Sequence, residues 1–468
     1  MSPTPVPAAP VSSERTRSGD QSNRSARPSS SSSHRVKSQA WSVLFASTWG
    51  FTVCFMVWMM FAAIGIPLRK ELNLSQAEFG LLTSMPVLSG SLIRVPLGIW
   101  TDRYGGRIVF AILMAVSMPG IFMIGYATQY WHFLVLGLFM GIAGGSFSVG
   151  TPYVARWFPA RLQGTAMGVF GAGNSGAAVN KFVAPALIAA FGWKAVPQVY
   201  AAVMLGTVIL FWLFSASNPR HLVPNTTRLS DQLRMMADPK VLKYCQYYSI
   251  VFGGYVGLSL WLLQYYQGEY GMTMQTAGFL TACFALPGGV LRAIGGYLSD
   301  KFGAHSVTWW VMWVMWLCLL LLSIPQVDIT TTAGGTRTFH MGLNVTIFTV
   351  LLFALGLAMA IGKASVFKYI GDEYTANIGA VSGAVGLAGG MGGFLLPIMF
   401  GYLQDLTGVR STAFMLLFGV VWVSLIWMYW TEVRRKDVFE STAPARQPAE
   451  RPERAPRPAI PAAARPRA

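Results

Sequence analysis

The sequence predicts an all-α protein that crosses a lipid bilayer many times. Of its 468 residues, 53% are hydrophobic and only 11% are charged, and the mean hydropathy is +0.48. A chain this apolar cannot cover itself with a water-facing surface. Apolar stretches of roughly 18 residues or more recur between Trp41 and Thr431, and each can span about 30 Å of hydrocarbon as a helix. We therefore expect a polytopic membrane protein.

The apolar stretches predict twelve transmembrane helices. Loops rich in Lys and Arg alternate with loops that hold fewer, and the positive-inside rule then places both termini in the cytoplasm. We expect a multi-pass protein of the inner (cytoplasmic) cell membrane. The predicted spans lie near 44–66, 77–100, 108–127, 132–155, 164–190, 197–216, 244–267, 275–299, 306–324, 344–369, 377–403 and 411–431.

The ends of the chain differ from this apolar region. Residues 1–40 and 432–468 are low in complexity and rich in Ser, Pro and Arg, so we expect disordered basic tails. They carry about half of the net charge of +17, and the excess therefore does not point to nucleic acid. A full-length span follows the first tail directly, so no cleaved signal peptide is expected. The four cysteines lie in apolar runs without metal or redox spacing.

An internal repeat divides the apolar region. The segment SGSLIRVPLGIWTDRYG (89–105) aligns without gaps to PGGVLRAIGGYLSDKFG (287–303) at an offset of 198 residues. Upstream, Gly80 and Thr83 fall on Gly278 and Thr281 at the same offset. Repeated halves are typical of secondary transporters. We therefore predict two six-helix bundles joined by a cytoplasmic linker, with the ranges 41–216, 217–243 and 244–431.

The repeat carries an arginine in the middle of each copy. Arg94 and Arg292 lie eight residues before Asp102 and Asp300, which places them about 12 Å deep in the membrane if the segments are helical. A charge at that depth costs several kcal/mol on insertion scales, so each side chain should face a cavity and have a partner. The alternative without a bound substrate is that one arginine reaches the membrane–water interface or pairs with backbone carbonyls.

The sequence provides no carboxylate for these charges. No Asp or Glu falls in the middle of a predicted span, while Arg94, Lys181, Arg292 and Lys363 do. Two cations ~8 Å apart in a medium of dielectric ~20 repel by about 2 kcal/mol, which a bound anion would relieve. The planar guanidinium donates hydrogen bonds in fixed pairs and suits a planar oxyanion such as nitrate or nitrite.

The loop GIWTDRYGGR (98–107), with its echo GYLSDKFG (296–303), resembles the loop between the second and third helices of the major facilitator superfamily. The resemblance implies helix-capping and gating roles at the inward-facing side. The residues concerned are Asp102, Arg103, Arg107, Asp300 and Lys301.

Two glycine-rich segments, GVFGAGNSGAAVNKFVAP (168–185) and GLAGGMGGFLLPIMFG (386–401), resemble the nitrate signatures of the NarK-like nitrate/nitrite porters. Glycines in membrane helices usually indicate close packing, and the rocking of one half on the other needs such smooth contacts. The signature glycines are Gly171, Gly173, Gly176, Gly389, Gly390, Gly392 and Gly393.

The resemblance covers residues 41–431 and assigns roles residue by residue. It implies that Arg94 and Arg292 bind the substrate anion. It further implies that Phe147 stacks on the anion and that Asn174 is the signature amide of the fifth helix. Tyr248 and Phe252 resemble the seventh-helix substrate contacts, although an aromatic stripe in a membrane helix is more often packing.

Lys363 and Lys181 resemble residues of the proton-coupled branch of the family, since the nitrite-exchanging branch lacks these charges. Nearby arginines would disfavour a protonated lysine, and an arriving anion would favour it. We therefore expect nitrate binding to promote protonation of Lys363, with Lys181 as a second candidate. The alternative for Lys363 is a purely structural role in the tenth helix.

These features predict nitrate uptake by proton symport through alternating access, in a monomeric functional unit, with nitrate, protons and the lipid bilayer as partners. Nitrate/nitrite antiport is the nearest alternative. A carrier of another small anion such as formate, an anion channel and a transport-silent sensor are more distant. We expect no enzyme and no cofactor, because the sequence holds no P-loop, metal-ligand cluster or nucleophile with its base.

Overall fold

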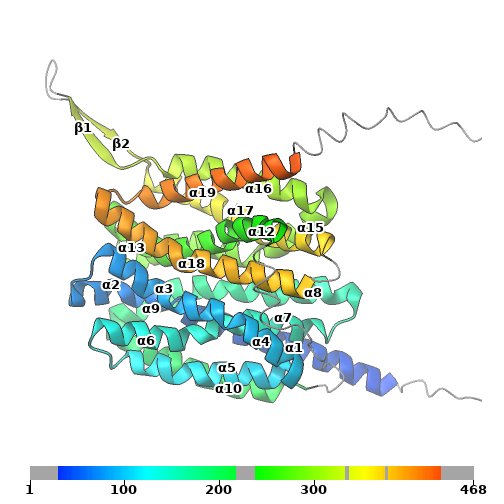
Figure 1. Cartoon of the computed structure of the whole chain (residues 1–468). Helices are drawn as coiled ribbons and strands as arrows, with labels where there is room; N and C mark the ends of the chain where they lie inside the picture. The colour runs from blue at the N-terminus through cyan, green and yellow to red at the C-terminus, as the bar shows by residue number, and fades with distance from the viewer. Residues whose placement is uncertain (1–29, 218–237, 332–336, 375–377, 434–468) are drawn as a thin grey trace, which may run out of the picture.

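Long helices lying side by side make up the structure (Figure 1). The computed structural model describes residues 30–217, 238–331, 337–374 and 378–433. The elements of the first half are α1 (Ser30–Trp58), α2 (Phe61–Leu72), α3 (Gln76–Leu92), α4 (Arg94–Tyr104), α5 (Gly106–Ile124), α6 (Tyr130–Gly141), the 3₁₀ turn η1 (Ile142–Gly145), α7 (Ser146–Ala155), α8 (Ala160–Gly171), the 3₁₀ turn η2 (Ala172–Ser175), α9 (Gly176–Phe191) and α10 (Ala195–Phe214).

The second half begins with broken helices like the first, but its fourth and fifth long helices are unbroken. Its elements are α12 (Pro239–Tyr248), the π-helix η4 (Ser249–Gly254), α13 (Tyr255–Tyr270), α14 (Met274–Val290), α15 (Arg292–Phe302), α16 (Ala304–Leu322), the strands β1 (Val327–Thr331) and β2 (Arg337–Met341), α17 (Val345–Glu373), α18 (Ile378–Thr407), α19 (Thr412–Met428) and the π-helix η5 (Tyr429–Val433).

Membrane-length helices confirm the predicted all-α membrane class. Nine helices of the described part are long and apolar enough to cross a bilayer, and there are ten when the bent pair α14 and α15 counts as one span. The segments α8 to α9 and α12 to α13 are not among these membrane-length apolar helices. In α8 to α9, buried polar side chains such as Asn174, Asn180 and Lys181 lower the mean hydropathy. The full number of twelve spans stays a prediction.

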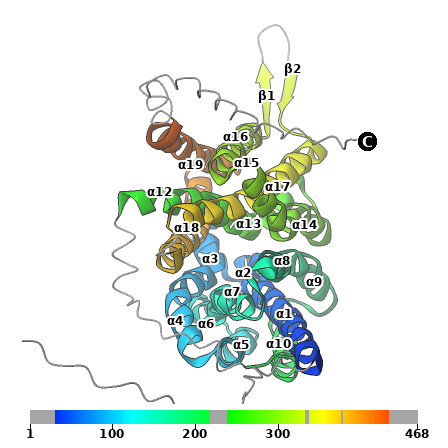
Figure 2. The same cartoon turned by 90° about the vertical axis from the view of Figure 1, so that its right-hand side faces the viewer.

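The helices gather in two groups. Figures 1 and 2 show α1 to α10 on one side and α12 to α19 on the other, with α3 and α9 of the first group facing α18 and α14 of the second. The two contacts are related by the repeat. Gly80 of α3 lies against the carbonyl of Pro397, and its repeat mate Gly278 lies against the carbonyl of Lys181.

The positions of Gly80 and Gly278 have no room for a side chain. We expect Gly80→Val to destabilise the protein by about 1 to 3 kcal/mol, because a Cβ at this position would overlap the carbonyl of Pro397. The control is Gly98→Val, since a Cβ at Gly98 meets no atom within 4 Å. Thermal unfolding of the two purified variants tests this, and equal melting temperatures would contradict the close contact.

The repeated loops end their helices on glycine. Gly105 follows α4 with a φ of 89°, and Gly303 follows α15 with a φ of 85°. A side chain is strained in this region of backbone conformation, so glycine is favoured there. The predicted helix-ending role of these loops is thus visible at both repeat positions.

Some element boundaries differ from those predicted. Helix α1 begins at Ser30, within the expected tail 1–40, because residues without proline can extend a helix that is already formed. Helix α12 begins at Pro239, within the expected linker 217–243, and the Asp238 side chain accepts the Lys240 N–H at 2.9 Å. Residues 1–29 and 434–468, for which disorder was predicted, and most of the linker lie outside the described residues.

The segment 325–343, which the sequence left unexplained, contains an antiparallel two-stranded ribbon that projects from the helices (Figure 1). Ile329 pairs with Phe339 at its centre. The Gln326 side chain joins its base to the bundle, since Nε2 donates to the Leu343 carbonyl at 2.6 Å and to the Tyr270 hydroxyl at 3.2 Å.

Candidate functional site

Each of the two arginines begins a short helix after a break. Arg94 is the first residue of α4, and Ile93 separates it from α3. Arg292 is the first residue of α15, which is bent by 46° from α14 at Leu291. The repeat therefore places both guanidinium groups at interruptions of a membrane helix. Interrupted helices are where many transporters build their binding sites.

Arg94 is buried, with 8% of its surface exposed. Its Nη1 donates to the Gly386 carbonyl of α18 at 3.2 Å, which is a contact between the two groups of helices. The guanidinium carbon lies 5.0 Å from the ring centre of Phe252 and 5.8 Å from that of Trp58. Its Nε is buried, and among the described residues no hydrogen-bond acceptor reaches it. Arg94 therefore keeps an unused donor in a desolvated position.

Arg292 is half-buried and lies between two rings. Its guanidinium carbon is 5.2 Å from the ring centre of Phe147 on α7 and 5.5 Å from that of Phe367 on α17. Within the part of the chain that the structure describes, neither Arg292 nor Arg94 has a carboxylate partner. Cation–π contacts orient the guanidinium but leave its donors available.

An aromatic cluster connects the two arginines. Phe367, beside Arg292, packs edge-on against Tyr248 with ring centres 4.8 Å apart. Tyr248 stacks in parallel on Phe252, which is beside Arg94, at 5.2 Å and an interplanar angle of 6°. The arginines thus lie at opposite ends of one cluster. We call Phe147, Tyr248, Phe252 and Phe367 the aromatic cluster.

Asn174, the remaining predicted substrate contact, lies apart from the two arginines. Asn174 in η2 is 4% exposed, and its Nδ2 donates to the Gly171 carbonyl of its own helix at 2.9 Å. Its backbone packs against Gly289 of α14, three residues before Arg292. The described contacts of Asn174 include neither arginine. Its role toward an anion stays a prediction.

Lys363 on α17 lies near Arg292, because α17 contacts both α14 and Arg292 itself. It is 1% exposed, its Nζ donates to the Gly288 carbonyl at 2.5 Å, and it lies 3.5 Å from the ring centre of Tyr255. Gly288 precedes Arg292 by one helical turn, and Phe367 follows Lys363 by one turn. One face of α17 therefore contacts α14 through Lys363 and Arg292 through Phe367.

Lys181 has a different environment. It is wholly buried on α9, and its Nζ has no hydrogen-bond partner among the described residues. Its described contacts do not join it to the aromatic cluster. Lys363 is therefore the lysine that the structure brings to the arginines, and Lys181 is not.

Most of the signature glycines let neighbouring groups pack closely against the helix. Gly389 makes room for the Tyr248 ring, and Gly390 for Ser91 of α3. Gly392 lies against Ser249, and Gly393 against Val256 and Val87. In the first half, Gly173 lies against Phe51 and Gly176 against the Thr52 carbonyl, while a Cβ at Gly171 would meet no atom within 4 Å. Close packing is thus visible at all of these positions except Gly171.

The acidic residues of the repeated loops are paired within their own halves. Asp102 forms an ion pair with Arg156, and Asp300 lies 3.3 Å from Lys368 Nζ. These partners were noted in the sequence only as loop charges. A gating role for the loops stays a prediction.

The basic residues of the same loops contact aromatic rings. Arg107 lies 4.2 Å from the ring centre of Trp212 and donates to the Trp212 carbonyl at 2.7 Å. Arg103 lies over Tyr104, and Lys301 over Phe302.

The two halves are also joined at the N-terminus of α3, the end away from these loops. The Asp405 carboxylate accepts the backbone N–H of Gln76 at 3.1 Å and that of Ala77 at 2.8 Å. An anion at a helix N-terminus satisfies free N–H groups and the helix dipole. Asp405 of the second half thus caps a helix of the first half.

Sequence reasoning missed Phe367, Trp58, Tyr255 and the two carbonyls that accept from the buried cations. Phe367 could have been found, because it follows Lys363 by four residues and a helix brings such positions to one face. The carbonyls of Gly386 and Gly288 could not, since every residue has one.

Membrane-length helices in two repeat-related groups, with buried cations between them, define a secondary membrane transporter. The family model described as Major Facilitator Superfamily matches residues 46–342 and 248–467. The chain has the fold of the nucleoside transporter NupG, solved as a point mutant, with a TM-score of 0.66 at 13% identity over 84% of this chain and 99% of that one.

Similar sequences indicate which members of this superfamily the chain resembles. The chain is 38% identical to the "Probable nitrate/nitrite antiporter NarK1" of Thermus thermophilus, over 84% of this chain and 91% of the relative. It is 30% identical to the "Nitrite extrusion protein" of Bacillus subtilis, over 81% and 92%. It is 28% identical to the "Probable nitrate transporter NarT" of Staphylococcus haemolyticus, over 81% and 94%. The chain belongs to the major facilitator superfamily, among its NarK-like nitrate/nitrite porters.

Proposed function

We propose that this protein takes up nitrate across the cytoplasmic membrane by alternating access, with nitrate held between Arg94 and Arg292. The observation that carries the proposal is the pair of repeat-related guanidinium groups at the two ends of the aromatic cluster, without a carboxylate partner in the described part of the chain. Nitrate is planar and delocalised. It can accept paired hydrogen bonds from a guanidinium while its faces lie against aromatic rings.

Proton coupling would use Lys363. Its Nζ donates to the Gly288 carbonyl one turn before Arg292, so the amine lies near the proposed anion site. The positive charge of Arg292 disfavours a second positive charge nearby, and an anion bound at Arg292 offsets that repulsion and favours the protonated lysine. In this scheme nitrate and proton occupy the carrier together, and the loaded protein reorients as a monomer with both termini in the cytoplasm.

Exchange of nitrate for nitrite is the second candidate. It is favoured by the name of the Thermus thermophilus relative, a probable antiporter. An exchanger needs the arginines but no titratable group, because one anion replaces another of equal charge.

Reconstitution into proteoliposomes with labelled nitrate separates these mechanisms. For one-to-one symport, an inside-alkaline gradient of one pH unit drives about tenfold accumulation at equilibrium. Internal nitrite should not replace the gradient, and an uncoupler should abolish accumulation. Uptake that requires internal nitrite and ignores the pH gradient would establish exchange instead. Large, unsaturable anion currents would establish a channel.

A further inference from the structure

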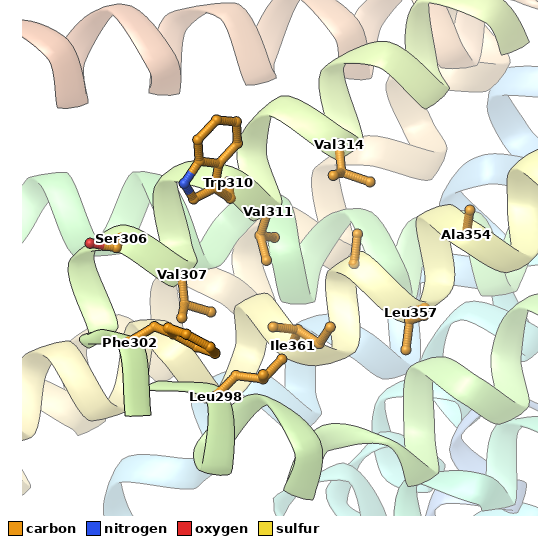
Figure 3. A pocket seen from close by; sticks show the side chains of 11 residues that line it. Leu298, Phe302, Ser306, Val307, Trp310, Val311, Val314, Ala354, Leu357 and Ile361 are labelled. Atoms are coloured by element: carbon orange, nitrogen blue, oxygen red, sulfur yellow. The ribbon is translucent and has the colours of Figure 1, made fainter. Parts of the chain in front are cut away.

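Two apolar grooves on the outer surface of the helices are related by the repeat. They have volumes of about 600 and 640 Å³. Groove A runs between α4 and α5, and groove B between α15, α16 and α17 (Figure 3). Corresponding lining residues differ by the repeat offset of 198. These pairs are Trp100 and Leu298, Tyr104 and Phe302, Ile108 and Ser306, Ile112 and Trp310, and Val116 and Val314.

Several of the lining side chains are exposed to the surroundings of the protein. Trp310 is 67% exposed, Phe302 58% and Tyr104 52%. In a bilayer such surfaces face lipid. Among the groove B positions, the polar groups are the Ser306 hydroxyl and the Trp310 indole N–H, so a peptide backbone inserted there would lack most of its hydrogen-bond partners. The groove thus suits a hydrocarbon chain. From Ser306 to Val314 it follows about 12 Å of helix, close to the ~15 Å of hydrocarbon in one leaflet.

A cation lies at the same end of each groove. The Arg103 guanidinium lies 5.3 Å from the ring centre of Tyr104, and Lys301 Nζ lies 5.1 Å from that of Phe302. Both cations and both rings are exposed. The neighbouring aspartates do not cancel these charges, because Asp102 pairs with Arg156 and Asp300 with Lys368.

We propose that each groove binds one anionic phospholipid of the leaflet at the Gly105 and Gly303 end of the bundle. An acyl chain lies along the groove, and the lipid phosphate contacts Arg103 in groove A and Lys301 in groove B. The charge complementarity selects an anionic lipid over a zwitterionic one, since each basic residue near an anionic membrane surface adds to the attraction. This proposal is independent of the substrate.

Native mass spectrometry of the delipidated full-length protein in non-ionic detergent, titrated with dioleoyl phosphatidylglycerol or dioleoyl phosphatidylcholine, tests the headgroup contacts. The wild type should retain two molecules of phosphatidylglycerol and bind phosphatidylcholine more weakly. Arg103→Gln and Lys301→Gln should each weaken one site by about fivefold. The control is Lys194→Gln, because Lys194 also lies over a ring, that of Trp193, but borders neither groove.

The acyl-chain contact is tested by filling the grooves. Ser306→Trp should remove one phosphatidylglycerol and leave the other, and Ile108→Trp should do the same in groove A. Both residues are at least partly exposed, so a larger side chain does not disturb the packed interior. Equal binding of the two lipids, or two retained phosphatidylglycerol molecules in the Ser306→Trp and Ile108→Trp double variant, would overturn the proposal. So would unchanged affinity in both glutamine variants.

Discussion

Replacing either Arg94 or Arg292 with lysine should lower the rate of labelled-nitrate uptake by about 100-fold or more. Lysine keeps the positive charge but loses the planar pair of donors and the stacking on the aromatic cluster. At Arg94 it would also lose the contact with the Gly386 carbonyl that joins the two halves. Uptake into proteoliposomes, normalised to the amount of folded protein, measures the loss.

The matched control for this prediction is Arg410→Lys. Arg410 Nη1 lies 3.1 Å from Glu269, and lysine can keep that ion pair. We expect its uptake to stay within about twofold of the wild type, since the pair keeps both of its charges and includes neither arginine of the site. Near-normal uptake by either Arg94→Lys or Arg292→Lys would refute the arginine site.

Replacing Lys363 with methionine should uncouple nitrate from protons. The variant keeps the volume of the side chain but cannot bind a proton, so accumulation driven by one pH unit should fall from about tenfold to none. Exchange of labelled for unlabelled nitrate should continue, because Arg94 and Arg292 are unchanged. Measuring accumulation and exchange on the same vesicles separates lost coupling from lost binding.

Lys181→Met is the comparison for Lys363. Lys181 is equally buried, but its described contacts do not reach the aromatic cluster. We expect Lys181→Met to retain pH-driven accumulation if the protein folds. Undiminished accumulation by Lys363→Met would exclude this lysine as the coupling group, and loss of both accumulation and exchange would assign it to binding or folding.

The repeat made Arg94 and Arg292 predictable, because a rare residue type recurred at equivalent positions in two membrane segments. Lys363 was predicted because it is a charged residue in an apolar span. The helix breaks at Ile93 and Leu291 were not foreseen, although Pro96 has no N–H to donate to the Leu92 carbonyl and so weakens the helix at Ile93. Nor was Phe367, although it follows Lys363 by one helical turn and that spacing could have indicated it.

Polar residues that serve packing lower the mean hydropathy of the segment α8 to α9. Asn180 donates to the Met59 carbonyl at 2.8 Å and accepts from the Tyr200 hydroxyl at 2.8 Å, all inside the first half. Such groups are satisfied internally and so tolerate the membrane. A local scale counts them as unfavourable. The contacts across the halves, such as Asp405 with Gln76, depend on the fold and could not be read from the sequence.

The backbone carbonyl of Gly386 has a consequence for turnover. It accepts a hydrogen bond from the buried guanidinium of Arg94. An arriving anion therefore exchanges with an acceptor that is already present, and the cation need never be left bare when the anion departs. Such exchange keeps the difference in free energy between the empty and the loaded carrier small. A carrier needs this, because an anion bound too tightly would not be released on the far side of the membrane.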